Sequence, residues 1–78
     1  MWWNLKKIQE DARYIIYGYG FESYDVSGRI RIDKQTERIT FEKLADGDTE
    51  DKSKRFATHV WATCFTENAP EERMIAIG

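Results

Sequence analysis

Hydrophobic and polar residues alternate along segment 28–44 and then recur every three to four residues along segment 49–67. Alternation places every second side chain on one face of a strand, whereas a three-to-four residue repeat places the apolar side chains on one face of a helix. The change of period falls at the acidic turn 45–50. It therefore predicts strands followed by a helix that covers them.

Two strands with one apolar and one polar face are predicted over 28–33 and 38–44. Ile30 and Ile32 alternate with charged residues in the first, and Ile39 and Phe41 alternate with polar residues in the second. The polar segment 34–37 has the length of a hairpin loop, so the two strands should pair antiparallel. One-sided patterning of this kind is typical of an antiparallel sheet with one face in water.

Segment 13–24 is rich in aromatic and β-branched residues and is predicted to be another strand. Both of its faces are apolar: one carries Tyr14, Ile16, Gly18 and Gly20, and the other carries Ile15, Tyr17, Tyr19 and Phe21. The glycine pair indicates either a bulge or a close approach of another segment to the backbone, and a helix could lie over it.

Residues 49–67 show the clearest helical pattern in the chain. Their apolar stripe consists of Phe56, Ala57, Val60, Trp61, Cys64 and Phe65. Asp48 or Thr49 can cap the first turn, where nearby carboxylates also favour the positive end of the helix dipole. Asn68 and Pro70 should end the helix.

The two ends of the chain are predicted less directly. A short helix is expected over about 3–12, because Trp2, Leu5, Ile8 and Ala12 fall at helical spacing. Residues 73–77 fit a strand or a docked tail; we favour a strand, which a right-handed connection would place parallel to a neighbour, the strand 13–24.

The fold class that follows is α+β within a single domain of residues 1–78. Its sheet has three or four mainly antiparallel strands, over 13–24, 28–33, 38–44 and, as the fourth, 73–77. One amphipathic helix over 49–67 covers this sheet.

Composition places the chain among globular proteins. An apolar fraction of 41% with three Trp, four Tyr and four Phe is too hydrophobic for a disordered chain. Twelve basic and fourteen acidic residues give a net charge of -2, which argues against bulk attraction to nucleic acid or anionic lipid. The single cysteine and the lack of a signal-peptide pattern predict a cytoplasmic location, and no apolar run is long enough to span a membrane.

Candidate chemistry is sparse. The acidic stretch 46–51 resembles the start of a calcium loop, but Asp51 and Ala57 occupy the positions that require Gly and Glu, and helix capping explains the carboxylates. His59 and Cys64 lie five residues apart on one helix, about 140° around its axis, so they cannot form a nucleophile–base pair. We therefore predict no catalytic, cofactor-binding or metal-binding residue and a protein that is not an enzyme.

The aromatic content exceeds what one helix easily covers, and uncovered aromatic surface usually marks an interface. We therefore expect a small intracellular protein-interaction module, with a homodimer as one form of that interaction. The candidate interface residues are Trp2, Trp3, Tyr17, Tyr19 and Phe21. The competing explanation for the high aromatic content is a second helix that covers these residues.

The alternative function is binding of single-stranded nucleic acid. Hairpin 28–44 carries five basic and three acidic residues. Arginines beside aromatic rings on an open sheet can hold single strands by phosphate contact and stacking. The candidate residues are Tyr17, Tyr19, Arg29, Arg31 and Arg38. A solvated face with cross-strand Arg–Glu pairs would explain the same charges.

Overall fold

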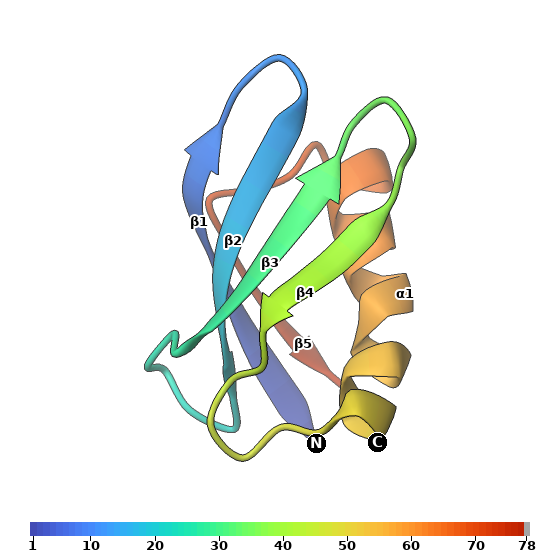
Figure 1. Ribbon diagram of the computed structural model, residues 1–78. Helices are drawn as coiled ribbons and strands as arrows, with labels where there is room; N and C mark the ends of the chain where they lie inside the picture. The colour runs from blue at the N-terminus through green and yellow to red at the C-terminus, as the bar shows by residue number, and fades with distance from the viewer. Residues whose placement is uncertain (78) are drawn as a thin grey trace.

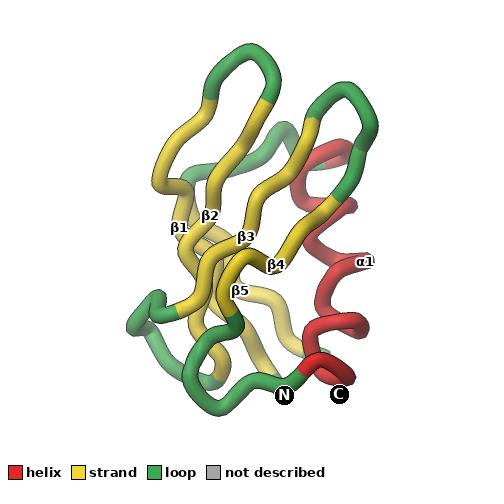
Figure 2. The backbone as a smooth tube through the Cα atoms, viewed as in Figure 1, coloured by secondary structure: helices red, strands yellow, loops and turns green. Residues whose placement is uncertain are grey.

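The computed structural model describes residues 1–77 as a five-stranded antiparallel sheet with one helix packed on one of its faces (Figure 1). The elements in chain order are β1 (Trp2–Glu10), β2 (Tyr14–Phe21), β3 (Gly28–Asp33), β4 (Ile39–Lys43), α1 (Glu50–Thr66) and β5 (Glu72–Ala76). The strand order across the sheet is β4-β3-β2-β1-β5. Within residues 1–77, no helix covers the face opposite α1 (Figure 2). The α+β class is confirmed, with more strands than expected.

The predicted N-terminal helix over about 3–12 is wrong, because this segment forms β1. Trp3 and Leu5 point into the core at the two-residue spacing of a strand. The register of β1 against β2 then shifts between Lys7 and Gln9, which leaves Ile8 in a bulge. Because the bulge interrupts the alternation, the apolar residues before and after it imitate a helical period.

Residues 73–77 do enter the sheet, but the expected parallel pairing with strand 13–24 is wrong. β5 pairs antiparallel with β1 at the edge of the sheet, where Trp3 lies opposite Ile75. β1 pairs antiparallel with β2 as well, so β5 runs in the same direction as β2 but is separated from it by one strand. The extra strand β1 takes the place beside β2.

Gly18 and Gly20 of β2 face away from α1. Loop 22–27, and not a helix, packs against them. A Cβ atom on Gly20 would lie 2.3 Å from the Asp25 carbonyl oxygen, and one on Gly18 would lie 3.1 Å from the Val26 side chain. Loop 22–27 therefore folds back over β2 on the open face. We use "open face" for the sheet face opposite α1, which carries Trp2, Ile16, Arg31 and Met74.

The core lies between α1 and the other face of the sheet, with aromatic rings at its centre. Phe56 of α1 stacks on Trp3 with the ring centroids 4.9 Å apart and also packs against Tyr19 at 5.5 Å. Aromatic pairs of this kind add about 0.5–1.5 kcal/mol each beyond the area that they bury. Phe56 therefore fixes where the helix crosses the sheet.

The helix begins where the sequence predicted. The Thr49 side chain accepts a hydrogen bond from the Lys52 N–H at 3.2 Å and caps the first turn. Asn68 and Ala69 adopt left-handed backbone conformations, with φ of 61° and 46°, and turn the chain from α1 toward β5. Thr63 is buried and donates its hydroxyl to the His59 carbonyl at 2.8 Å.

Candidate functional site

The structure buries three of the five residues predicted for an aromatic interface. Trp3, Tyr17 and Tyr19 are 0% exposed beneath α1, so they cannot touch a partner. Their polar atoms are also used internally, because the Tyr17 hydroxyl donates to the Pro70 carbonyl at 2.5 Å. Trp2 and Phe21 are half-buried and remain partly accessible.

Other apolar side chains are more exposed than any of these. Tyr24 is 73% exposed, Ile8 54% and Met74 44%. The Tyr24 ring of loop 22–27 packs on Trp2 of β1 with the centroids 5.3 Å apart, so the two form an aromatic pair on the open face. The sequence does not reveal their exposure, because Tyr24 continues the strand-like pattern of 13–24 and Ile8 fits the helical spacing of 3–12.

Among residues 1–77, no strand pairs with the outer edge of β5, which lies beside a groove. Lys7 N–H donates to the Glu71 carbonyl, and Met1 and Ile77 exchange two backbone hydrogen bonds. In an antiparallel pair the bonded positions alternate, so the backbone groups of Glu72, Met74 and Ala76 point away from β1. A hollow of about 360 Å³ lies there between β5 and α1, and we call it the edge groove; its lining includes His59, Ala62, Thr63, Arg73, Met74 and Ala76.

The arginines proposed for nucleic-acid binding lie on the open face, but two of the three are paired. Glu42 bridges Arg29 at 3.2 Å and Arg31 at 3.6 Å. Among residues 1–77, no carboxylate lies within ion-pair distance of Arg38. Tyr17 and Tyr19, the proposed stacking partners, lie on the opposite face of the sheet.

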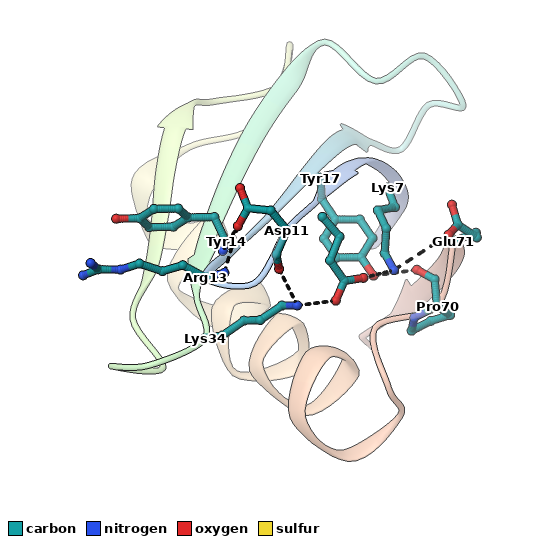
Figure 3. Close-up of polar contacts among 9 residues, drawn as sticks. Lys7, Asp11, Arg13, Tyr14, Tyr17, Lys34, Pro70 and Glu71 are labelled. Atoms are coloured by element: carbon teal, nitrogen blue, oxygen red, sulfur yellow. Dashed lines mark hydrogen bonds and ion pairs between the residues drawn. The ribbon is translucent and has the colours of Figure 1, made fainter.

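A different set of residues surrounds Arg31 and Arg38. They line a depression of about 490 Å³ at the end of the sheet where β1 turns into β2, and we call it the arginine groove. Its other lining residues are Arg13, Tyr14, Asp33, Thr36 and Thr40. In Figure 3 the Arg13 and Tyr14 side chains extend to the same side, away from Lys34 and Lys7.

Tyr14 and Asp33 hold two of these arginines in place. The Arg13 and Arg31 guanidiniums lie 5.3 and 5.5 Å from the centroid of the Tyr14 ring, within the range of cation–π attraction. Arg13 Nη2 also contacts Asp33 Oδ2 at 3.2 Å. Burial by itself raises the pKa of Asp33, but hydrogen bonds from the Thr36 and Gln35 N–H groups and from Arg13 outweigh it and lower the pKa.

A second polar cluster lies on the α1 side of the same turn (Figure 3). Glu10 accepts one contact from Lys7 and one from Lys34, both at 2.6 Å, and Lys34 also donates to the Asp11 carbonyl at 2.7 Å. The hydrogen bonds from Lys34 and Lys7 lower the pKa of Glu10, and the hydrogen bond to Glu10 raises the pKa of Lys7. Both shifts favour the charged forms, so the cluster ties β1 to the β3–β4 loop and is a poor proton donor or acceptor near neutral pH.

The candidate nucleophile is equally unsuited to chemistry. Cys64 is 7% exposed, and burial raises the pKa of its thiol to about 11. A thiol in that state is largely protonated near neutral pH and reacts slowly. Residues 1–77 contain no group of three or more His, Cys, Asp or Glu side chains placed to hold a metal ion. They also include no helix with the length and apolar character needed to cross a membrane.

No protein-family model matches the chain, and comparisons with curated proteins and with solved structures find no significant match. The geometry of the edge groove and of the arginine groove is therefore the basis for a functional proposal.

Proposed function

We propose that the protein is a non-enzymatic interaction module that binds an extended segment of a partner protein along β5. The edge groove carries this proposal, because it places outward-pointing backbone groups of β5 beside a hollow of about 360 Å³. One of these groups, the Met74 carbonyl, accepts a hydrogen bond from Arg73 Nη1, which an added strand would replace. An extended chain that adds to such an edge gains main-chain hydrogen bonds, and pockets beside the edge select its side chains.

The surroundings of the edge support the same function. Met74 is 44% exposed on the open face of β5, where it would contact the side chains of an added strand. On the α1 side, Arg73 Nε donates to Glu67 Oε1 at 2.9 Å, which holds one wall of the groove.

A second copy of the chain is one partner that this edge could accept. Two β5 strands pairing antiparallel about a twofold axis would join two sheets into one, and twofold dimers of this self-complementary kind are common. Sedimentation velocity over a wide concentration range distinguishes the cases. A dimer that forms at micromolar concentration would identify the chain as its own partner, whereas a monomer would direct the search to other proteins.

Binding of single-stranded nucleic acid has weaker support. Stacking requires an accessible aromatic ring, but Tyr17 and Tyr19 are buried and the Tyr14 ring already contacts two guanidiniums. A labelled oligothymidylate titrated at low salt tests this alternative, because phosphate contacts are strongest there. Tight binding in that titration would favour nucleic acid over a protein partner.

The edge proposal predicts a specific effect of proline at position 74. Met74→Pro removes an N–H that points outward and leaves the backbone bonds from β5 to β1 in place. We expect ligands selected from a library of displayed peptides to bind this variant about tenfold more weakly or worse, because an unmatched carbonyl costs about 1–3 kcal/mol. The affinities would be measured by isothermal titration.

Met74→Ala is the matched control, since it removes the same side chain but keeps the N–H. Its affinity measures the contribution of the Met74 side chain and should exceed that of Met74→Pro, and circular dichroism should show that both variants are folded. The proposal fails if no peptide is selected and the chain stays monomeric, or if the two variants lose affinity equally.

A further inference from the structure

We infer that the arginine groove binds the phosphate group of a phosphate monoester. This site lies on the open face at the end formed by the β1–β2 and β3–β4 turns, and its use does not depend on the edge of β5. Its three guanidiniums come from separate places in the chain: Arg13 from the turn before β2, Arg31 from β3 and Arg38 from the residue before β4.

The arginines are arranged to receive an anion. Arg13 and Arg31 are fixed against the Tyr14 ring, and Arg13 is also held by Asp33 at 3.2 Å. Their side chains are still 52% and 45% exposed, so N–H groups remain available. Arg38 is exposed and has no carboxylate partner among residues 1–77, which leaves its guanidinium free for a ligand. Thr36 and Thr40 line the same hollow.

The charge of the groove matches a phosphate monoester better than a carboxylate. Three guanidiniums and the Asp33 carboxylate sum to +2, and adding the neighbouring Glu42 together with its partner Arg29 leaves that sum unchanged. A monoester carries about −1.5 to −2 near neutral pH. A carboxylate carries −1 and has two oxygens, which a single guanidinium already satisfies. The three terminal oxygens of a phosphate group can accept from all three arginines at once.

A nucleic-acid strand fits this site less well. Each phosphodiester carries a single negative charge, and affinity for a strand comes from a charged track with free stacking surfaces. Here the charge is concentrated in one hollow of about 490 Å³, and Glu42 neutralises Arg29 and part of Arg31 on the neighbouring surface.

Titration with phenyl phosphate, followed by amide and arginine side-chain NMR shifts, tests the inference. Saturable shifts should centre on Arg13, Tyr14, Arg31 and Arg38. Arg38→Gln should weaken binding about tenfold or more, because it removes a charge-assisted contact. Arg55→Gln makes the same charge change at an exposed position on α1, outside the groove, and should leave binding within about twofold, as expected for a distant surface charge screened by salt.

The charge of the ligand gives a second readout. Phenyl sulfate has the same ring and one negative charge, and it should bind about tenfold more weakly. Phenyl phosphate should itself bind more weakly as the pH falls through about 6, where the ester takes up a proton. The charged and titratable groups that face the ligand are Arg13, Tyr14, Arg31, Asp33, Arg38 and the nearby Glu42. Hydrogen bonds lower the pKa of Asp33 and contact with Asp33 raises the pKa of Arg13, so both keep their charge in this range.

Three results would overturn the inference: equal effects of Arg38→Gln and Arg55→Gln, equal affinity for phenyl sulfate and phenyl phosphate, or an oligothymidylate that binds through the groove more tightly than any monoester. Two further ligands identify the source of the phosphate. Tighter binding of a phosphoserine peptide would support the site as a reader of modified protein, and tighter binding of adenosine 5′-monophosphate would support it as a nucleotide site.

Discussion

Asp48 connects the acidic turn to the core of the molecule. Its Oδ2 accepts hydrogen bonds from the Tyr19 hydroxyl at 2.8 Å and from Trp3 Nε1 at 3.4 Å, while its Oδ1 accepts from the Thr49 N–H at 2.8 Å. The Tyr19 hydroxyl in turn accepts from the Ala45 N–H at 3.0 Å. The turn that starts α1 is therefore fastened to β1 and β2 as well as capped.

Replacing this carboxylate should destabilise the protein. Asp48→Ala leaves a buried hydroxyl and an indole N–H without an acceptor, and we expect the free energy of unfolding to fall by about 1–3 kcal/mol. Urea unfolding followed by tryptophan fluorescence measures the loss. Asp46→Ala removes the same charge from an exposed side chain of the same turn and should change stability by less than about 0.5 kcal/mol. Equal losses in the two variants would show that turn charge, and not the buried contacts, stabilises the start of α1.

At the scale of elements, the glycine pair of β2 determines where loop 22–27 lies. Gly20 has backbone atoms of the loop as neighbours, since an added Cβ would come within 2.5 Å of two carbonyl oxygens. Gly18 has side-chain atoms of Val26 and Ile8 as neighbours, at 3.1 and 3.2 Å. Side-chain atoms can move by a few tenths of an ångström more easily than a backbone that is already packed.

The two glycines should therefore respond differently to alanine. Gly20→Ala should destabilise the protein by about 1–3 kcal/mol through overpacking and displace the loop. Gly18→Ala should leave the stability almost unchanged. Alanine loses less conformational entropy on folding than glycine does, and this gain offsets the tighter contact. Thermal unfolding gives the stabilities, and the NOE between the Trp2 and Tyr24 rings reports the loop position. Persistence of that NOE in Gly20→Ala would contradict the role assigned to this glycine.

Local sequence patterns were sufficient to predict some elements of the fold but not others. Strands 28–33 and 38–44 and helix 49–67 were predicted to within a residue or two of β3, β4 and α1. Their periods are regular along their whole length, so a local pattern identifies them. β1 was mistaken for a helix because the bulge at Ile8 breaks its alternation, and a bulge depends on pairing with β2, which no local pattern contains.

At the scale of the whole molecule, the burial of Cys64, Tyr17 and Tyr19 between α1 and the sheet makes the protein less stable at alkaline pH. Burial raises the pKa of the Cys64 thiol from its ordinary value of 9.0 to about 11 and raises the pKa of the Tyr17 and Tyr19 phenols above 10.0. The unfolded chain therefore releases these protons at lower pH than the folded protein does. The stability that they contribute is complete below about pH 9 and is lost as the pH rises through the folded-state values.

We expect the free energy of unfolding from urea titrations to fall steadily between about pH 9 and pH 11. In Cys64→Ala the fall should begin about one pH unit higher, where unfolded tyrosines start to ionise. The comparison uses the pH dependence and not the absolute stability, because the variant also loses packing. The same onset in both proteins would exclude the thiol as the group that titrates first.

The candidate sites were only partly predictable. Arg31 and Arg38 were placed correctly on the wet face, because the alternation of β3 and β4 is local information. Arg13 and Tyr14 could not be joined to them from sequence, since that requires the register of β2 against β3, in which Tyr14 lies opposite Asp33. The edge groove likewise exists only because β5 pairs with a strand that the sequence did not reveal.

The sequence by itself determined the type of most elements, the position where α1 begins and the face that each strand of the 28–44 hairpin turns to water. These features follow from the hydrophobic period and from helix capping, which depend on residues close to one another in the sequence. Tertiary structure alone decided the order β4-β3-β2-β1-β5 and which face of β2 lies under α1. β2 is apolar on both faces, so its pattern cannot choose between them. The choice came from contacts distant in sequence: Phe56 packs on Trp3 and Tyr19 on one face, and loop 22–27 closes over the glycines on the other.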